Sequence, residues 1–349
     1  MLVFFFLILA FILFLLQRRI YFRIWRRCLS VSVTFENERT AEGEGNTVIE
    51  RMENRSVFPV HVIFVKYSLL RSYSPLSDDS GRKEISFKGG IGGRKIKERR
   101  YRIDALRRGY YTVSRIDASG RDIFLSAEYE NHFYPQSSFF VFPKRIDTLS
   151  FDLCYRELLG AVLTKRRRNE DPFELRGIRD YMTSDSMKSV NWKASAKTGD
   201  LKVNEHDWTT DEGASIILDL RRGTEDEKET LISYAATAAE RFLRRGINTS
   251  LVSNARSSRD GSRIRTDRGS GYGHGTAIDE SLALIKTTAV TDETPSELIS
   301  IIETDNTSFL LITRTLESED ECRGYDCVIC FDSKVGKCDA RIIEIGGEA

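Results

Sequence analysis

The apolar run at the start of the chain constrains the fold more than any other feature. Leu2 to Leu16 is fifteen consecutive apolar residues without charge, glycine or proline. As an α-helix it would be roughly 23 Å long, somewhat short of a hydrocarbon core of about 30 Å. Ile20 to Trp25 can extend the helix, with Arg18 and Arg19 reaching toward the membrane surface. The sequence therefore predicts a membrane anchor and its basic flank over residues 1–27.

The charges that follow this run predict its orientation. The flank holds five arginines and no acid, namely Arg18, Arg19, Arg23, Arg26 and Arg27. Since positive flanks stay on the cytoplasmic side, we expect the later domains in the cytoplasm, with or without a further helix upstream. A cleaved signal peptide is the alternative, but the run lacks a basic segment before it and a small-residue cleavage site after it. The expected location is the cell membrane, with a single span.

Composition describes a globular protein without a bias toward nucleic acid. Apolar residues make up 40% of the 349 residues and charged residues 30%, and the length suits about two domains. Lysine and arginine total 53 against 52 acids, so no global field selects a polyanion. Lys88 to Arg108 is locally basic, with nine basic residues and two acids. Its alternation with apolar residues favours a strand with one solvated face.

Residues 30–145 carry the pattern of a β-sandwich. Val31, Val33 and Phe35 alternate with polar residues, and Val57 to Tyr67 and Phe139 to Phe142 are rich in β-branched and aromatic residues. Glycine- and serine-rich turn signals separate these runs. Short strands with frequent turns predict an all-β domain.

Residues 213–349 alternate between strand and helix patterns. Buried strands are expected at Ser215 to Leu220, Thr249 to Val252, Ser308 to Ile312 and Cys327 to Phe331. A capping box of Thr224 and Glu227 begins the first helix, which Gly246 ends. Two further helices are expected to begin at Thr276 and Thr294, whereas residues 256–275 read as a solvated loop. This alternation predicts a doubly wound α/β domain with a mainly parallel sheet.

Four late cysteines raise the question of a zinc site: Cys322, Cys327, Cys330 and Cys338. Two of them, Cys327 and Cys330, lie inside an apolar strand pattern, where residues three apart point to opposite faces. We therefore favour buried, reduced thiols over metal ligands.

Between the two domains, residues 146–212 form a segment too polar for a core helix and too structured for a linker. Its candidate site residues are Arg176, Arg179, Asp180, Tyr181, Asp185, Lys188, Trp192, Lys193 and Lys197. A helix is expected over Ser186 to Lys197, with Asp185 as N-cap and Gly199 beyond its end. A tryptophan flanked by cations is typical of a protein-binding anchor. The other interpretation is a brace that packs the two domains together, with the arginines paired to aspartates.

The order and spacing of these residues resemble the signature of the domain-of-unknown-function-58 family. The matching positions are Arg179-Asp180-Tyr181, Asp185, Lys188, Val190, Trp192, Lys193, Ala196 and Lys197. Leu106 to Tyr111 and Phe140 to Pro143 resemble two further strands of that family. Ser184 replaces a glycine of the pattern, and Lys188 and Lys197 replace arginines, so arginine-specific pairing is not expected there.

The resemblance implies a C-terminal domain similar to von Willebrand factor A domains. Such domains bind Mg²⁺ through an Asp-x-Ser-x-Ser loop, completed by oxygens of later loops. Asp219 lies at the expected aspartate position, and Thr276 is the candidate threonine of the second loop. Arg221 and Gly223 stand at the serine positions. Because a fixed positive charge repels a cation, we interpret the metal site as degenerate and expect no cofactor.

The resemblance also implies a partner, a MoxR-type AAA+ ATPase. The four histidines are dispersed, and no Gly-x-Ser-x-Gly or His-Glu-x-x-His motif occurs. The leading hypothesis is a membrane-anchored, cytoplasm-facing interaction scaffold that assists assembly or maturation of envelope-associated proteins, without nucleic acid. One alternative is a Mg²⁺-dependent adhesion module. Another is a hydrolase of envelope or peptide substrates that uses Asp180, Asp185 and His206. The expected fold is α/β plus all-β behind a membrane helix.

Overall fold

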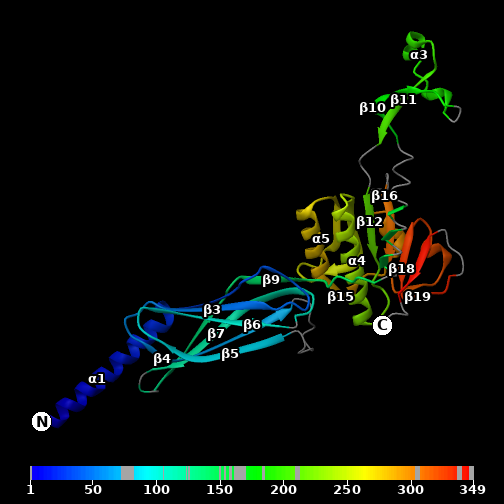
Figure 1. Ribbon diagram of the computed structural model, residues 1–349. Helices are drawn as coiled ribbons and strands as arrows, with labels where there is room; N and C mark the ends of the chain where they lie inside the picture. The colour runs from blue at the N-terminus through cyan, green and yellow to red at the C-terminus, as the bar shows by residue number, and fades with distance from the viewer. Residues whose placement is uncertain are drawn as a thin grey trace. The chain divides into compact units, whose positions relative to one another are not determined.

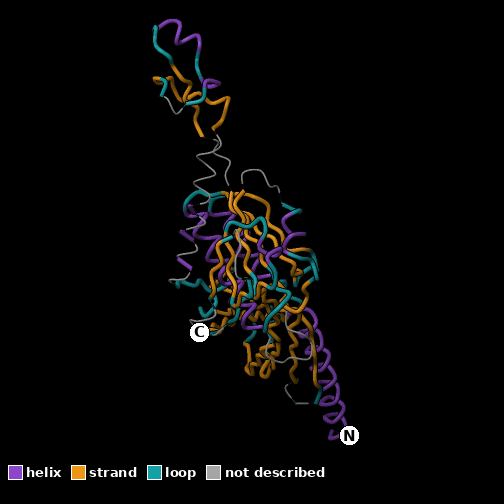
Figure 2. Tube along the Cα trace, turned by 90° about the vertical axis from the view of Figure 1, so that its right-hand side faces the viewer, coloured by secondary structure: helices purple, strands orange, loops and turns teal. Residues whose placement is uncertain are grey.

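In the computed structural model the chain folds as two units. The described residues are 2–71, 82–104, 106–122, 124, 126–148, 151–152, 155–156, 159–160, 170–182, 185–208, 213–302, 307–335 and 340–345. Unit 1 comprises Met1–Lys144, Ser257–Gly261 and Leu282–Lys286. Unit 2 comprises Arg145–Arg256, Ser262–Ser281 and Thr287–Ala349. Strands make up most of the regular structure (Figure 2).

Unit 1 begins with the apolar helix α1 (Leu2–Arg23), which continues through the π-helical turn η1 (Ile24–Cys28). The 22 residues of α1 correspond to about 33 Å, more than a hydrocarbon core of about 30 Å. Within the described residues, one segment, Val3–Cys28, is long and apolar enough to cross a membrane, and its most apolar stretch is not buried by the protein. The predicted apolar helix is therefore confirmed, and it extends past Leu16 as expected.

Two sheets form the rest of unit 1 (Figure 1). The first is antiparallel in the order β1-β3-β6, formed by β1 (Leu29–Phe35), β3 (Asn46–Asn54) and β6 (Lys95–Ile103). The second has the order β2-β9-β7-β4-β5, and β8 also pairs with β7. Its strands are β2 (Arg39–Ala41), β4 (Val60–Arg71), β5 (Arg82–Ile91), β7 (Gly109–Arg121), β8 (Glu128–Phe133) and β9 (Ser137–Phe142).

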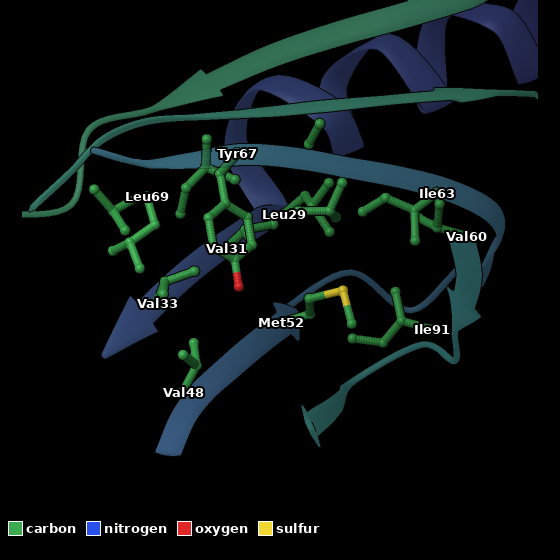
Figure 3. Close-up of a cluster of buried hydrophobic side chains, with 14 of the residues drawn as sticks. Leu29, Val31, Val33, Val48, Met52, Val60, Ile63, Tyr67, Leu69 and Ile91 are labelled. Carbon is green, nitrogen blue, oxygen red and sulfur yellow. The ribbon is translucent and has the colours of Figure 1, made fainter. Parts of the chain in front are cut away.

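A buried apolar cluster joins the two sheets (Figure 3). Strand β1 contributes Val31 and Val33, β3 contributes Met52, and β4 contributes Ile63 and Leu69. In each strand the buried side chains alternate with exposed ones, which is the pattern of sheets that bury one face each. The predicted β-sandwich is the architecture of unit 1.

One inward position of β3 carries a carboxylate instead of an apolar side chain. Glu50 is 2% exposed, accepts a hydrogen bond from the Tyr67 hydroxyl at 2.6 Å and another from Arg99 Nη2 at 3.2 Å. Burial raises the pKa of Tyr67, so its hydroxyl stays protonated and donates. Part of the basic stretch from Lys88 to Arg108 is thus a partner for a buried acid, which the sequence pattern did not indicate.

A seven-stranded sheet, most of whose residues belong to unit 2, has the order β14-β13-β12-β16-β18-β20, with β15 also paired to β13. Its strands are β12 (Gly213–Leu218), β13 (Asn248–Ser257), β14 (Arg263–Gly269), β15 (Ile285–Val290), β16 (Thr307–Ile312), β18 (Cys327–Cys330) and β20 (Arg341–Glu344). Strands β13, β12, β16, β18 and β20 run parallel, and β14 is antiparallel to β13. The prediction of a mainly parallel sheet is confirmed.

Helices cover both faces of this sheet. Helix α6 (Pro295–Ile299) adds Leu298 to the buried cluster that contains Ile217 and Leu311. Helix α4 (Glu225–Arg244) also contacts β12 and β16. Its buried residues lie outside that cluster, and neighbouring strand residues point to alternate faces, so α4 covers the opposite face. This arrangement is the doubly wound form that the strand and helix alternation predicted.

The capping signals of the α/β domain are confirmed where the structure describes them. Thr224 and Glu227 form a capping box at the start of α4, and Thr294 forms another at α6 with proline in the first turn. The predicted stripe of α4 is buried: Leu231, Ala235, Ala238 and Phe242. Gly246 follows the helix with φ +72°, a conformation that glycine adopts at little cost.

The expectation of a solvated loop over residues 256–275 is wrong. Arg263–Gly269 forms strand β14, and helix α5 (Tyr272–Leu284) begins before Thr276. Within β14 only Ile264 is an apolar residue buried in the core, so hydrophobic periodicity could not identify this strand. Its main-chain pairing with β13 does not depend on side-chain polarity. Thr276 lies inside α5, where its hydroxyl donates to the Tyr272 carbonyl at 3.1 Å.

The late cysteines that the structure describes are buried. Cys322 and Cys330 belong to the cluster under α6, and Cys327 is also fully buried on β18. Burial raises the pKa of the Cys330 thiol to about 12, which leaves it protonated at neutral pH. Cys338 lies outside the described residues. Small elements complete this part of unit 2: the parallel pair β17 (Thr315–Leu316) and β19 (Asp332–Ser333), and the turn η4 (Glu319–Cys322).

Candidate functional site

The residues that resemble a family signature lie on one hairpin of unit 2. Strands β10 (Glu170–Asp180) and β11 (Lys202–Trp208) pair antiparallel, and the connection contains η3 (Met187–Ser189) and α3 (Trp192–Thr198). Figure 1 labels β10, β11 and α3. We call the described residues from 170 to 208 the signature hairpin. The side chains of Arg176 and His206 lie outside the described residues.

The expected continuous helix over Ser186 to Lys197 is wrong. Val190 is extended and forms an isolated bridge with Val203, so it separates η3 from α3. The Asn191 amide donates to the Lys202 carbonyl at 2.8 Å, a bond made outside the helix. Helix α3 therefore starts again at Trp192, with Asn191 as its N-cap through a 3.0 Å bond from the Ala194 amide. Tertiary pairing with β11 overrides the helical pattern at this point.

Asp185 is not the helix N-cap that we expected. It instead binds side-chain and main-chain donors within the hairpin. Its carboxylate accepts two bonds from Arg179, at 2.6 and 2.7 Å, and one from the Met182 amide at 2.9 Å. The paired guanidinium lowers the pKa of Asp185 to about 2. The Tyr181 hydroxyl donates to the Asp185 carbonyl at 3.2 Å. These bonds join Asp185 to the end of β10 and to the two described residues that follow it.

Asp180 has a different partner, since Lys202 on the facing strand donates to its carboxylate. Strand pairing puts Asp180 directly opposite Lys202, which explains the contact. The two aspartates of the hydrolase alternative are thus each bound to a cation. The pair with Arg179 keeps the pKa of Asp185 low, so this carboxylate is a poor proton donor near neutral pH.

The hairpin exposes large apolar side chains beside its lysines. Trp192 is 62% exposed, and the neighbouring apolar residues Ile178, Met182, Met187 and Leu201 are also exposed. Lys188, Lys193 and Lys197 are exposed, as the sequence suggested. Ser195 on the same helix is instead buried, and its hydroxyl donates to the Asn191 carbonyl at 2.9 Å. The signature hairpin therefore exposes Trp192 together with three lysines, Lys188, Lys193 and Lys197.

The second candidate site lies at the carboxyl end of β12, in the α/β domain. Asp219 follows this strand and is 3% exposed. Its carboxylate accepts bonds from Arg221 Nη2 at 2.8 Å, Asn254 Nδ2 at 2.6 Å and the Thr313 hydroxyl at 3.2 Å. Asn254 is on β13 and Thr313 follows β16, so the two neighbouring strands complete the site. The Asp219 partnership raises the pKa of Arg221 further above its ordinary value.

This donor set does not fit Mg²⁺. The ion needs several oxygen ligands around it, whereas the oxygens of Asp219 face a guanidinium and an amide group. Gly223 stands at the second serine position with φ +103°, and an added Cβ would lie 3.0 Å from Arg314 and Glu227 side-chain atoms. A serine there would be strained as well as crowded. The fold therefore supplies no second hydroxyl ligand for a metal at this described position.

Thr276 is not brought to Asp219. Two residues before it, His274 Nε2 contacts the Thr249 carbonyl at 2.7 Å. Thr249 pairs with Ala214 near the start of β12, five residues before Asp219 and about 16 Å away along the strand. The start of α5 thus lies toward the amino-terminal end of β12, whereas Asp219 lies beyond its carboxyl end. The hydroxyl that contacts Asp219 is that of Thr313.

Two functional positions escaped the sequence interpretation, although one left a signal. Asn191 precedes an apolar and cationic stretch, as an N-cap asparagine does, and the competing Asp185 obscured it. Asn254 lies in a strand that reads as apolar, and nothing in its local sequence links it to Asp219. Only the parallel pairing of β12 with β13 brings those two residues together.

No protein-family model and no curated protein matches this chain. Solved structures with some similarity include the CARDB domain of the PF1109 protein from Pyrococcus furiosus, 13% identical, with 32% of this chain and 89% of that chain covered at a TM-score of 0.22. Spo0M, a sporulation control protein from Bacillus subtilis, is 14% identical, with 44% and 58% covered at a TM-score of 0.20. At these TM-scores neither similarity informs the function of this chain.

Proposed function

We propose that this protein is a membrane-anchored interaction scaffold whose signature hairpin binds a partner protein. The observation that carries the proposal is Trp192, a large aromatic side chain 62% exposed on a fastened hairpin. Exposing an indole to water is unfavourable, and interface hot spots are enriched in tryptophan. A tryptophan that only stabilised the fold would be expected in a buried cluster.

The residues around Trp192 are held by contacts within the hairpin, which reduces the conformational entropy lost when a partner binds. Asn191 caps α3 at one end, and Gly199 ends it with φ +83° at the other. Before this helix in the chain, Arg179 donates two hydrogen bonds to the Asp185 carboxylate. Because these contacts exist before any partner arrives, binding would cost less conformational entropy than ordering a loose loop. Exposed lysines beside the indole favour a partner surface with acidic residues.

The identity of the partner rests on the family resemblance. That resemblance implies a MoxR-type AAA+ ATPase as the partner, and the α/β unit would be the von Willebrand factor A-like part. The mainly parallel sheet with helices on both faces supports that assignment. The arginines after α1 support a cytoplasmic location, where an ATPase finds its nucleotide. The ion pair of Asp219 with Arg221 supports binding without Mg²⁺ and weighs against the metal-dependent alternative.

Replacing Trp192 tests the interface. In Trp192→Ala we expect the affinity for the ATPase to fall by roughly 30-fold, since a hot-spot tryptophan contributes about 2 kcal/mol. The measurement is co-purification of the full chain from membranes, followed by titration of the solubilised protein with the ATPase. The melting temperature should stay within a few degrees, because the side chain is exposed.

Tyr272→Ala is the matched control, because Tyr272 is an aromatic residue of the same unit and is 94% exposed. It should leave the affinity unchanged. Equal affinity of the unaltered protein, Trp192→Ala and Tyr272→Ala for the ATPase would show that Trp192 of the signature hairpin is not part of the interface. Loss of affinity in both variants would show a nonspecific response to deleting surface aromatics.

A further inference from the structure

Helix α1 joins the β-sandwich of unit 1 without a hinge. Gln17 Nε2 donates to the Asp122 carboxylate at 3.1 Å, the Tyr129 hydroxyl donates to the Arg18 carbonyl at 3.1 Å, and Asn131 Nδ2 donates to the Trp25 carbonyl at 2.8 Å. The side chain of Trp25 is 1% exposed. Polar bonds and burial over the last two turns fix the sandwich to the end of the helix. The position of α1 in a bilayer therefore sets the position of the nearest sandwich loops.

Phe124, between β7 and β8, lies beside the apolar part of α1. Phe124 in this connection is 63% exposed, and its ring centroid is 6.2 Å from that of Phe14. Phe14 precedes Arg18 by four residues, so it lies about 6 Å deeper in the membrane than the first arginine of the flank. Arginines at the end of a spanning helix stay at headgroup level. In a bilayer spanned by α1, the Phe124 ring would lie beside Phe14 at the depth of the acyl chains.

The acid of this connection does not oppose such a position. Asp122 is 2% exposed, and its carboxylate accepts bonds from the Ser126 amide at 2.7 Å and from Gln17 on α1. A carboxylate with these internal partners needs fewer bonds to water than an exposed one. The charge of Asp122 is therefore turned toward the helix, whereas the Phe124 ring is exposed.

A cavity of about 670 Å³ adjoins this connection, between the end of α1 and β8. Its lining includes Arg18, Arg19, Arg26 and Tyr129. Cations and amphipathic aromatic side chains are the groups that accumulate at the headgroup layer. Glu128 also lines the cavity and is paired with Arg121 at 3.6 Å. The polar wall begins where the apolar face of α1 ends, as a surface that meets the headgroups requires.

We propose that this end of unit 1 is a lipid-binding surface, in which Phe124 enters the acyl region of the bilayer beside Phe14. The adjoining cavity then lies among the phospholipid headgroups. The protein would hold the membrane at two points, α1 and the β7–β8 connection, and the sandwich would stand in one orientation on the membrane surface.

A tryptophan introduced by Phe124→Trp reports the depth of this position. The full-length variant is reconstituted in phospholipid vesicles, and the emission of the unaltered protein, which contains three tryptophans, is subtracted. We expect the added emission to be shifted to shorter wavelength. Lipids brominated on the acyl chain should quench it several-fold more strongly than acrylamide in the water phase. Substitution of one exposed aromatic by another should leave the melting temperature unchanged.

Tyr134→Trp is the matched control. Tyr134 follows β8, is 70% exposed and does not line the cavity, and it lies about 20 Å along the strand direction from Glu128 at the start of β8. Its added emission should be at long wavelength, quenched by acrylamide and not by brominated lipid. The proposal is overturned if the indoles introduced by Phe124→Trp and Tyr134→Trp respond alike, or if the full-length protein does not float with the vesicles.

Discussion

In the α/β domain, the side chain of Arg221 pairs with the buried carboxylate of Asp219. Its guanidinium donates to both oxygens of Asp219, at 3.0 Å through Nε and 2.8 Å through Nη2. Asp219 is 3% exposed, so without this partner it would be a buried and poorly compensated charge. Arg221 is thus the positive charge that compensates the buried Asp219 at the end of β12.

Removing Arg221 should therefore cost far more than removing its neighbour. We expect Arg221→Ala to lower the free energy of unfolding by about 3 kcal/mol, because breaking a buried pair leaves the other charge uncompensated. Arg222→Ala should cost under about 1 kcal/mol, since Arg222 pairs with Glu317 at the surface. Denaturant unfolding of the solubilised full chain measures both. A rise in melting temperature of the unaltered protein with excess Mg²⁺ would contradict this account, since a ligand that binds the folded state stabilises it.

Polar contacts join the described residues of the signature hairpin, among them the pair of Arg179 with Asp185. Because two bonds from Arg179 lower the pKa of Asp185 to about 2, this carboxylate is ionised in the folded protein at every physiological pH. Its unfolded value is about 3.9. A depressed folded pKa contributes stability that is present above the unfolded value and is lost as the pH falls through about 2. The pair of Asp185 with Arg179 should therefore persist in mild acid.

A carboxyl-carbon NMR titration of aspartate-labelled protein measures this expectation. The Asp185 resonance should titrate at about pH 2, the value given by its pairing. In Arg179→Ala it should titrate closer to the ordinary aspartate value of about 3.9. A midpoint near that ordinary value in the unaltered protein would mean that the pair with Arg179 does not form in solution.

At the scale of elements, prediction succeeded where local signals agreed with the packing. Helix α4 has a capping box at Thr224, an apolar stripe and Gly246 after its end, and all of these are observed. The stretch from Ser186 to Lys197 has comparable helix signals but is broken at Val190. The difference is a main-chain bond to β11, which a helical pattern cannot show. Strand β14 was missed for the same reason.

At the scale of the whole molecule, one arginine connects residues far apart in the sequence. Arg108 of unit 1 is 1% exposed, and its Nη1 donates to the carbonyls of Leu282 at 2.6 Å, Ala283 at 3.2 Å and Ile285 at 3.2 Å. Segment Leu282–Lys286 belongs to the same unit. Arg108 lies in the stretch Leu106 to Tyr111 that resembles a family strand, so the structure provides a physical reason for an arginine there.

Arg108→Ala should lower the free energy of unfolding by on the order of 3 kcal/mol, because buried carbonyls lose a charged donor. Arg107→Ala is the matched control, since Arg107 is exposed, and it should change stability by less than about 0.5 kcal/mol. Thermal unfolding of the two full-length variants, followed by circular dichroism, measures the difference. Equal stability of the two would show that the carbonyls find other donors.

The sequence by itself determined the elements whose cause is local. The apolar run from Leu2, the alternation in β1 and the capping boxes of α4 and α6 each depend on residues within a few positions of one another. The tertiary structure alone decided the partners: Arg221 and Asn254 for Asp219, Arg179 for Asp185, and Phe14 for Phe124. Those contacts depend on strand order and register, which bring distant residues together and leave no periodic trace in the chain.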